Sequence, residues 1–415
     1  MRILILTQYY PPETGAPQNR LSDLARRLNQ AGHDVAVLTA LPNYPRGEIF
    51  EDYRGRALME ENVSGVKVVR TWIYATPKKG FLRRLLNYFS FVFSSVALGA
   101  WKVGSPDVVV VESPPLFLGI SAELLAFFKN SRLVFNVSDL WPDSAVAMGI
   151  LHNPWLIRLS RYLEEFLYRR SFLITGQTQG IVDNIQSRFP DKRVALITNG
   201  VDIKRFMHAA TGDRKSEIKN EFALTDQFVV GYAGLHGLAQ GLESVVQTAR
   251  LLVTEKDIVF AFFGDGPEKE KLVQLVNHLG LQNFRFHPSQ IAERMPAIIG
   301  SFDIALVPLR RLELFKGALP SKMFEAMAAA VPIIVSIDGE ARALVERARA
   351  GLFVEAEDPK AMAGAILELY RDRECLTTLG LNGRQYVIEH YDRQKIAERF
   401  ERLLFANDCP ETATV

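Results

Sequence analysis

Short apolar runs alternate with segments of helical periodicity along most of the chain, and this alternation constrains the fold most. The runs are rich in branched residues and show little polar alternation, which is typical of parallel strands covered on both faces. The expected strands form a first series, Ile3–Thr7, Val35–Thr39, Val66–Thr71, Val108–Val111, Leu133–Val137, Phe172–Ile174 and Val194–Thr198, and a second series, Phe228–Ala233, Ile258–Phe263, Phe284–Phe286, Ile304–Val307, Ile333–Val335 and Leu352–Val354. The pattern predicts an α/β protein with doubly wound parallel sheets.

A polar span between Asn199 and Asp226 interrupts the alternation. The 415 residues are too many for one hydrophobic core, so two domains are expected. We place them at 1–200 and 201–390, each with a Rossmann-like sheet. An amphipathic helix within 391–408 follows the second series, and we expect it to pack across the junction.

The composition disfavours several classes of protein. A net charge of +2 argues against a nucleic-acid binder driven by bulk electrostatics. Cys375 and Cys409 form neither a ligand cluster nor a disulfide framework, so a reducing, cytoplasmic location is expected. The first apolar run breaks into Tyr-Tyr-Pro-Pro without a small-residue cleavage site, which predicts a buried strand and not a signal peptide.

Parallel sheets bind ligands beyond the carboxyl ends of their strands, which makes the loops there candidate sites. In the first of these loops, Gly15 would let a ligand approach the backbone just before a helix whose amides could bind an anion. Ordinary turn chemistry is the equal alternative.

The loop from Gly231 to Gly241 follows the first strand of the second series and holds four glycines, including Gly234 and Gly237. So many glycines favour close contact with a ligand over tight helix–sheet packing. His236 in the same loop is expected to be solvated or structural.

The segment Gly264-Asp-Gly266 begins like a dinucleotide-binding fingerprint, but Pro267 follows and the third glycine is missing. This departure disfavours a nicotinamide or flavin site, and Pro267 is expected in the first turn of a helix. The chain also lacks the Gly-Lys-Ser/Thr sequence of a P-loop.

The stretch GALPSKMFEAMAAAVPIIVS, residues 317–336, predicts an anion pocket. Pro320 suits the first helical position, so the amides of Ser321 and Lys322 would point out of the helix N-terminus and the Lys322 charge would attract a diphosphate. Glu325, one turn later, could accept hydrogen bonds from the hydroxyls of a ribose. The alternative is a surface ion pair between Lys322 and Glu325, worth only about 0.2–0.5 kcal/mol.

These loops occur together and in order, and with them the chain resembles the GT-B retaining glycosyltransferases of the fourth sequence family. The nearest resemblance is to bacterial L-fucosamine and N-acetyl-sugar transferases of O-antigen or capsule synthesis. It covers nearly the whole chain and rests on the fragments MRILILTQYYPPETGAPQNRLSDLARRLNQAGHDVAVLT, NVSDLWPDS, ITNGVDIKRF, GYAGLHGLAQGLE, FFGDGP, FDIALVPL, LPSKMFEAMAAAVPIIVS and GLFVEAEDP.

The resemblance implies two domains that face a cleft, with 1–200 binding the acceptor and 201–390 binding the sugar nucleotide. It implies that the last helix, 391–408, crosses back to the first domain. Glu325 would bind the donor ribose, Gly15 would lie near the diphosphate, and the Gly264–Gly266 loop and His287 would flank the base.

Three features depart from the family pattern. Gly317 stands where many members carry another glutamate near the donor sugar, and Ser138 stands where a histidine is common. Leu235 and Gln240 stand where many members have an arginine and a lysine that bind the diphosphate. The cations expected to replace that pair are Lys322 and, as further candidates, Arg310, Arg311 or Lys316.

In the first domain, Asp139 is the best candidate for contact with the acceptor or donor sugar, and Glu112 is a weaker one. An N-cap for the following helix is an equal alternative for Asp139. The expected catalytic set is therefore Asp139, Lys322 and Glu325.

The resemblance implies retaining transfer from a UDP-sugar to a lipid-linked saccharide, with the leaving phosphate helping to deprotonate the acceptor hydroxyl. Such a reaction requires stabilisation of the diphosphate more than a protein base. No Asp-x-Asp motif occurs in the chain, so neither a metal nor another cofactor is expected. A sugar-nucleotide 2-epimerase and a catalytically silent partner subunit are the alternatives.

The segment Lys78–Lys102 joins a basic start to an apolar, aromatic body. Its uncharged part, Leu85–Trp101, is marginal in length for a membrane span and contains polar residues. We expect a helix whose body packs inside, with an exposed edge formed by Lys78, Lys79, Phe81, Leu82, Arg83 and Arg84. That edge would hold the protein peripherally at the inner face of the cell membrane.

Overall fold

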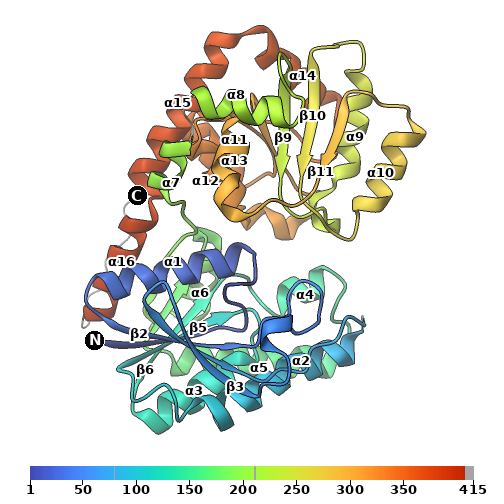
Figure 1. The fold of residues 1–415 in the computed structure, drawn as a ribbon. Helices are drawn as coiled ribbons and strands as arrows, with labels where there is room; N and C mark the ends of the chain where they lie inside the picture. The colour runs from blue at the N-terminus through green and yellow to red at the C-terminus, as the bar shows by residue number, and fades with distance from the viewer. Residues whose placement is uncertain (79, 210–211, 407–415) are drawn as a thin grey trace. The chain divides into compact units, whose positions relative to one another are not determined.

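The computed structural model describes residues 1–78, 80–209 and 212–406. The chain divides into two compact units, one formed by Met1–Thr198 with the segment that begins at Ile396, and the other by Asn199–Lys395. Each unit is built on one sheet with helices on both faces (Figure 1). The expected α/β class with two Rossmann-like units is confirmed.

The first sheet has the strand order β3-β4-β2-β1-β5-β6-β7-β8. Its strands are β1 (Arg2–Leu6), β2 (Asp34–Ala40), β3 (Leu58–Val63), β4 (Val66–Thr71), β5 (Val108–Ser113), β6 (Arg132–Val137), β7 (Leu173–Gly176) and β8 (Val194–Leu196). All neighbours pair in parallel except β3, which runs antiparallel to β4 at the edge. Strand β3 was not expected, because its half-exposed, acidic sequence LMEENV lacks a continuous apolar run.

Two layers of helices cover the first sheet. The helices are α1 (Ala16–Gln30), α2 (Phe81–Ser94, continued by a π-helical turn, Ser95–Gly99), α3 (Leu118–Lys129), α4 (Asp143–Ala147), α5 (Pro154–Arg170), α6 (Gln179–Arg188) and α16 (Arg393–Phe405). The core on one face includes α1 and α16, and the core on the other includes α2, α3 and α5.

The C-terminal helix α16 packs on the first unit from Ile396 onward. Phe400 and Leu404 are buried in its core, and His33 contacts Glu401 with 2.9 Å between Nε2 and Oε1. Residues 407–408 of the expected helix lie outside the described residues.

The second sheet is parallel throughout, in the order β11-β10-β9-β12-β13-β14. Its strands are β9 (Phe228–Ala233), β10 (Ile258–Phe263), β11 (Phe284–His287), β12 (Ile304–Pro308), β13 (Ile333–Ser336) and β14 (Gly351–Phe353). Its helices are α7 (Ile203–Ala209), α8 (Gly212–Glu221), α9 (Leu242–Leu251), α10 (Lys269–His278), α11 (Met295–Gly300), α12 (Ser321–Ala328), α13 (Glu340–Ala348), α14 (Pro359–Arg371) and α15 (Arg373–His390).

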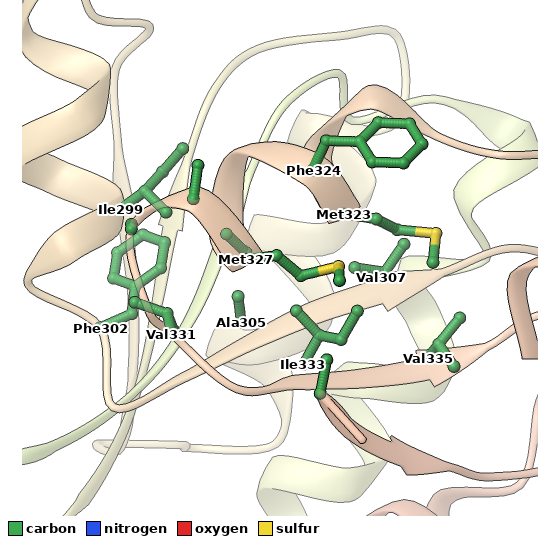
Figure 2. Packing of buried hydrophobic residues seen from close by; sticks show 14 of the residues in the cluster. Ile299, Phe302, Ala305, Val307, Met323, Phe324, Met327, Val331, Ile333 and Val335 are labelled. Atoms are coloured by element: carbon green, nitrogen blue, oxygen red, sulfur yellow. The ribbon is translucent and has the colours of Figure 1, made fainter. Parts of the chain in front are cut away.

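Helix α12 is anchored on the second sheet by one apolar side. Figure 2 shows Met323 and Met327 directed toward Val307, Ile333 and Val335 of the two adjacent strands. All of these side chains are buried. Because 322 and 325 fall between the buried positions of the helix, their side chains lie on the side of α12 that is turned away from this core.

Candidate functional site

The N-terminus of α12 carries no side-chain cap and no acidic residue in its first turn. The helix begins at Ser321, and Pro320 occupies the N-cap position in extended backbone instead of the first helical position that was expected. The amides of the first turn have no partner within the helix. They form a partial positive charge that suits an anion.

Lys322 binds a phenol and not a carboxylate. Its Nζ donates to the Tyr232 hydroxyl at 2.9 Å and lies 4.0 Å from the centroid of that ring. The Tyr232 hydroxyl in turn donates to the carbonyl of Leu235 at 2.6 Å. Burial lowers the pKa of Lys322 to about 7, against the opposing effect of Glu325.

Glu325 is half-buried, and its carboxylate makes no hydrogen bond or ion pair with the rest of the described chain. Burial raises its pKa, while the charges of Arg393, Lys322 and Arg205 act in the opposite direction. The interpretation as a simple Lys322–Glu325 surface ion pair is therefore wrong. A desolvated carboxylate without a protein partner is a candidate for ligand binding.

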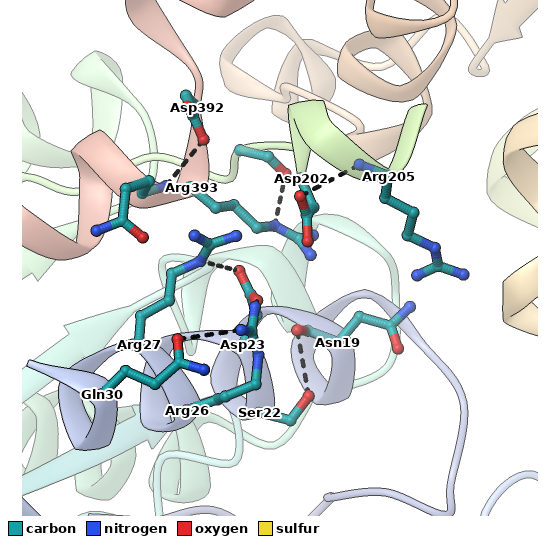
Figure 3. A network of polar contacts seen from close by, with 12 residues as sticks. Asn19, Ser22, Asp23, Arg26, Arg27, Gln30, Asp202, Arg205, Asp392 and Arg393 are labelled. Carbon is teal, nitrogen blue, oxygen red and sulfur yellow. Dashed lines mark hydrogen bonds and ion pairs between the residues drawn. The ribbon is translucent and has the colours of Figure 1, made fainter. Parts of the chain in front are cut away.

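The two arginines near Glu325 were not singled out by the sequence analysis. They belong to a polar cluster with Asp202 and Asp392 (Figure 3). Within it the Arg205 amide donates to Asp202 at 3.4 Å, and Arg393 Nε donates to the carbonyl of Gly200 at 2.9 Å. No local pattern marks these arginines, because both lie far from Glu325 in the sequence.

The loops after β9 and β10 pack against each other through backbone. A Cβ on Gly264 would lie 1.9 Å from the Gly234 carbonyl oxygen, and one on Gly266 would lie 2.4 Å from the carbonyl oxygen of His236. Both glycines also have positive φ, 149° and 157°. Contact between the loops therefore explains Gly264 and Gly266 without a ligand.

The four glycines of the Gly231–Gly241 loop have different roles. Gly231 lies within β9 and packs under Phe302, where a Cβ would lie 2.1 Å from that ring, and Gly241 is the N-cap of α9 with φ 58°. A Cβ on Gly234 would lie 3.1 Å from Lys322 Nζ, and one on Gly237 would lie 2.7 Å from Gln240 Oε1. Two of the four are thus structural, and Gly234 borders the lysine.

His236 is fully buried, which excludes the solvated alternative and leaves the structural one. Neither ring nitrogen has a partner within the described residues. Burial lowers its pKa to about 4, helped by Lys269 and Lys322 and opposed by Asp265. A neutral imidazole with two unpaired nitrogens beside Lys322 marks this region as polar and unsatisfied.

His287 ends β11 and stacks on Phe263, with 4.5 Å between the ring centroids. Its Nε2 is buried and has no partner in the described part of the chain. Burial, then the charges of Arg285 and Lys269, lower its pKa. Pro267, by contrast, lies outside α10, which begins at Lys269.

The other cations proposed for the diphosphate have different surroundings. The Cγ atom of Arg310 would contact a Cβ on Gly241 at 3.2 Å. Arg311 lines a hollow of about 880 Å³ with α9 and residues 355–360. Lys316 pairs with Glu313 at 2.9 Å. Of these candidates, Lys322 is the one that the structure places against the Gly234–Leu235 backbone. A Cβ on Gly317 would lie 4.0 Å from Glu340 Oε1.

In the first unit, Gly15 precedes α1 with φ 165°, a conformation open to any residue. A Cβ there would lie 2.5 Å from Gln18 Oε1, an atom that is buried and has no partner among the described residues. The N-terminus of α1 has no side-chain cap. Farther along the helix, Asp23 binds Arg26 and Arg27 (Figure 3).

Asp139 follows β6 and is half-buried. Burial raises the pKa of its carboxyl, and the Leu140 amide acts in the opposite direction. Pro142 occupies the N-cap of α4, so the N-cap interpretation of Asp139 is wrong.

Glu112 is occupied by protein partners. It is buried and accepts from Arg20 at 2.6 Å, from Asn136 Nδ2 and from the Ser138 hydroxyl. This network joins α1 to the ends of β5 and β6 and leaves Glu112 a structural residue beside Asp139.

Two features are absent from the described residues. In residues 1–78, 80–209 and 212–406, no group of three or more His, Cys, Asp or Glu could hold a metal ion. No helix of this part of the chain is long and apolar enough to cross a membrane.

Comparison with known proteins gives matches to both units. The model for the glycosyl transferase 4-like domain matches residues 15–200, and the model for glycosyl transferases group 1 matches residues 227–372.

Individual proteins match over nearly the full chain. WcaI of Escherichia coli, named as a glycosyl transferase of colanic acid biosynthesis, is 26% identical over 96% of this chain and 98% of its own length. A GDP-mannose-dependent phosphatidylinositol monomannoside mannosyltransferase of Mycobacterium tuberculosis is 24% identical over 98% of this chain and 99% of its own. The Anabaena HepE structure with UDP and glucose has a TM-score of 0.73 at 17% identity, over 98% and 99% of the two chains.

Proposed function

Because the chain belongs to the group 1 glycosyl transferases and has their GT-B architecture, we propose that it is a retaining glycosyltransferase that uses a UDP-sugar donor. The observation that carries the donor site is the half-buried Glu325 carboxylate, which has no protein partner and lies one turn from an uncapped helix N-terminus. In this proposal the Glu325 carboxylate accepts hydrogen bonds from the ribose hydroxyls. The diphosphate is bound by the backbone amides of Ser321 and Lys322 and by the Lys322 ammonium. His287 and the Gly264–Gly266 loop flank the base.

The proposed transfer occurs on one face of the sugar. The bond from the anomeric carbon to the diphosphate oxygen breaks, the bond to the acceptor oxygen forms, and the acceptor proton passes to the departing diphosphate. Lys322 and the α12 amides stabilise the charge that develops on the leaving group. Asp139 is the proposed first-unit contact for acceptor or donor sugar, and no step is assigned to a metal.

The proposed sugar is an N-acetylated amino sugar, and the proposed acceptor is a polyprenyl-diphosphate-linked saccharide of bacterial surface polysaccharide synthesis. The colanic acid assignment in the name of WcaI supports the polysaccharide, and the lipid in the name of the mycobacterial enzyme supports a lipid-linked acceptor. Such an acceptor requires a protein at the cytoplasmic face of the membrane. The GDP-mannose dependence of the mycobacterial relative makes the donor base the first point to test.

Thermal unfolding of the full chain with UDP, GDP or ADP tests which nucleobase the donor carries. A ligand that binds only the folded protein raises its apparent stability, so UDP should raise the melting temperature more than GDP or ADP. If GDP or ADP stabilises the protein and UDP does not, the donor is a GDP- or ADP-sugar and the proposed UDP-sugar is wrong.

A second assay tests the reaction. The protein is incubated with UDP-N-acetylglucosamine and a short polyprenyl-diphosphate saccharide, and the products are identified by NMR. Transfer with retained anomeric configuration supports the proposal. Epimerised nucleotide sugar in the absence of acceptor would identify a 2-epimerase, and unchanged substrate despite nucleotide binding would identify a silent partner subunit.

A further inference from the structure

The helices α2 and α5 of the first unit each present an apolar stripe to solvent. On α2 the exposed residues are Leu82, Leu86, Phe89 and Phe93, and on α5 they are Trp155, Leu159, Tyr162 and Phe166. Both sets follow the spacing i, i+4, i+7, i+11, which places four side chains on one side of a helix. Phe93 is 72% exposed and Trp155 is 78% exposed, so these stripes are not core.

Helix α5 buries two polar residues in its middle and two apolar or aromatic residues, Leu167 and Tyr168, near its end. Ser160 and Glu164 are buried, and Glu164 pairs with Arg188 at 2.7 Å. The larger apolar residues Leu159 and Tyr162 remain exposed. Four apolar or aromatic side chains therefore stay on the outer side of α5, and an exposed stripe of this kind indicates a partner for that side.

The two stripes belong to one layer. Helix α3 packs against both α2 and α5 on the same face of the sheet (Figure 1) and exposes Leu124, Phe127 and Phe128. Trp101, 84% exposed, follows the π-helical turn that continues α2. We name the exposed apolar residues of α2, α3 and α5, with Trp101, the three-helix face.

The structure corrects the expectation that the body of the segment Lys78–Lys102 packs inside. Phe91 is buried, but Leu86, Phe89 and Phe93 of the same helix are exposed. Lys79 lies outside the described residues.

The charges on these helices are mainly basic. Helix α2 carries Arg83 and Arg84 and no acidic residue, and both arginines are exposed. Helix α5 carries four arginines and two glutamates, one of which is the buried Glu164. Three of these arginines pair with carboxylates, Arg161 with Asp143, Arg169 with Glu165 and Arg170 with Glu123 of α3, so the net positive charge of the face comes mainly from α2. Exposed apolar and aromatic side chains beside arginines are the pattern of surfaces that enter the interface of an anionic bilayer.

From this arrangement we infer that the three-helix face docks onto an anionic lipid bilayer, with its aromatic and aliphatic side chains inserted between the headgroups. A second copy of the chain fits less well, because a two-fold interface would bring the arginines of one copy against those of the other. The inference deepens the proposed function by naming the surface that reaches a lipid-linked acceptor. Vesicle binding requires no transfer, so either can fail without the other.

Cosedimentation with phosphatidylglycerol-containing vesicles tests the inference on the full chain. The wild type should bind, and part of this binding should persist at high salt because apolar insertion is not screened. The variant Phe93→Ser/Leu159→Ser should bind at least about tenfold more weakly, since each exposed side chain loses its transfer into the bilayer. The variant Arg83→Glu/Arg84→Glu should lose mainly the preference for anionic over neutral vesicles.

The matched control is Ile291→Ser/Leu381→Ser in the second unit, where both side chains are similarly exposed. It should bind vesicles as the wild type does. The four tryptophans all belong to the first unit, so their fluorescence checks that this unit stays folded. Quenching of tryptophan by brominated lipid in the wild type, and its loss in Phe93→Ser/Leu159→Ser, would report insertion directly.

Two outcomes would overturn the inference. One is unchanged vesicle binding in Phe93→Ser/Leu159→Ser. The other is a wild type that does not bind anionic vesicles at low salt, in which case sedimentation velocity shows whether the face is instead a dimer contact that the same variant disrupts.

Discussion

The ammonium of Lys322 on α12 lies 2.9 Å from the hydroxyl of Tyr232 at the end of β9. The same ammonium lies 4.0 Å from the centroid of the Tyr232 ring, so the phenol provides both an acceptor and a cation–π contact. The Tyr232 hydroxyl donates a 2.6 Å hydrogen bond to the Leu235 carbonyl, so it connects the lysine to the Gly231–Gly241 loop. Its charge is thereby held beside the N-terminus of α12 without neutralisation by a carboxylate.

This arrangement predicts that donor binding weakens above neutral pH. The pKa of Lys322 is about 7 in the free protein, and a bound diphosphate should raise it. Binding then takes up protons above pH 7, so affinity for a UDP-sugar should be constant below pH 7 and fall as the pH rises toward the pKa in the complex. Isothermal titration calorimetry over this range measures both the affinity and the proton uptake.

The matched variant for this prediction is Lys322→Arg, whose guanidinium stays charged and should remove the pH dependence. An affinity of the wild type that is flat from neutral to alkaline pH would contradict the assignment of Lys322 to the diphosphate. In the free protein the pKa lies below the ordinary value of 10.5, so the unfolded chain binds more protons between pH 7 and 10.5. The contribution of Lys322 to stability should therefore rise with pH in that window.

Glu325→Gln should affect stability and binding in opposite directions. Burial raises the pKa of Glu325 above that of the unfolded chain, so its ionised form lowers stability at neutral pH, and this cost disappears as the pH falls through the folded pKa. The amide should leave the melting temperature of the free protein equal or higher. Donor affinity should fall by about 1.5–3 kcal/mol if a charge-assisted hydrogen bond to ribose is lost.

The control is Glu346→Gln, in which an exposed carboxylate loses only its ion pair with Arg342. That change should be within about 0.5 kcal/mol in stability and neutral for binding. A Glu325→Gln protein that melts at a lower temperature and binds donor normally would make Glu325 a structural residue.

Gly264→Ala should destabilise the second unit. The new Cβ would lie 1.9 Å from the Gly234 carbonyl oxygen at a φ of 149°, so the two loops must separate. We expect a loss of at least about 1–3 kcal/mol. Gly364→Ala in α14 meets nothing within 4 Å and should instead stabilise by about 0.5–1 kcal/mol.

Calorimetry of the two glycine variants measures the changes. Tryptophan fluorescence should report an unchanged first unit in both, because all four tryptophans lie there. Equal stability of the two variants would show that the loops after β9 and β10 adapt without cost.

The buried pair of Arg20 and Glu112 predicts a recoverable loss of stability in the first unit. Arg20→Met leaves the buried Glu112 carboxylate without its cation and should cost about 3–5 kcal/mol. Adding Glu112→Gln removes the uncompensated charge, and its amide can accept from Asn136 and donate to the Ser138 hydroxyl, so it should restore much of that loss. Urea unfolding followed by tryptophan fluorescence measures this unit alone, and a double variant no more stable than Arg20→Met would refute the explanation.

Much of the architecture could be predicted from local pattern. A strand buried on both faces must be apolar along its length, so Val108–Val111 and Ile258–Phe263 were expected as strands and are strands. The edge strand β3 was not predicted, because one of its faces is exposed and its sequence is therefore polar and acidic. Element ends also differed, as at Pro320 and Pro267, because proline fits the N-cap and the preceding loop as well as the first turn.

The candidate site could be predicted only in part. Lys322 and Glu325 were found because they share a short helix with a proline before it, which is a local signal. Tyr232, which binds Lys322, is 90 residues away from it in the sequence. Arg205 and Arg393, whose charges act on Glu325, are also far from it and from each other, so residue spacing could not predict these neighbours. The glycines of the two loops show the same limit, since a glycine required by another loop and a glycine required by a ligand look alike in the sequence.

The sequence by itself determined the strand–helix order, the class of fold and the charged helix start at Ser321, because each depends on residues close together in the chain. Only the tertiary structure decided what each surface contacts. On α5, periodicity identifies an apolar side with Leu159 and Tyr162 but cannot say whether that side meets the sheet or solvent. The fold leaves that side exposed and buries Ser160 and Glu164 together with Leu167 and Tyr168. Arg188, from the next helix, supplies the partner that allows the Glu164 carboxylate to be buried.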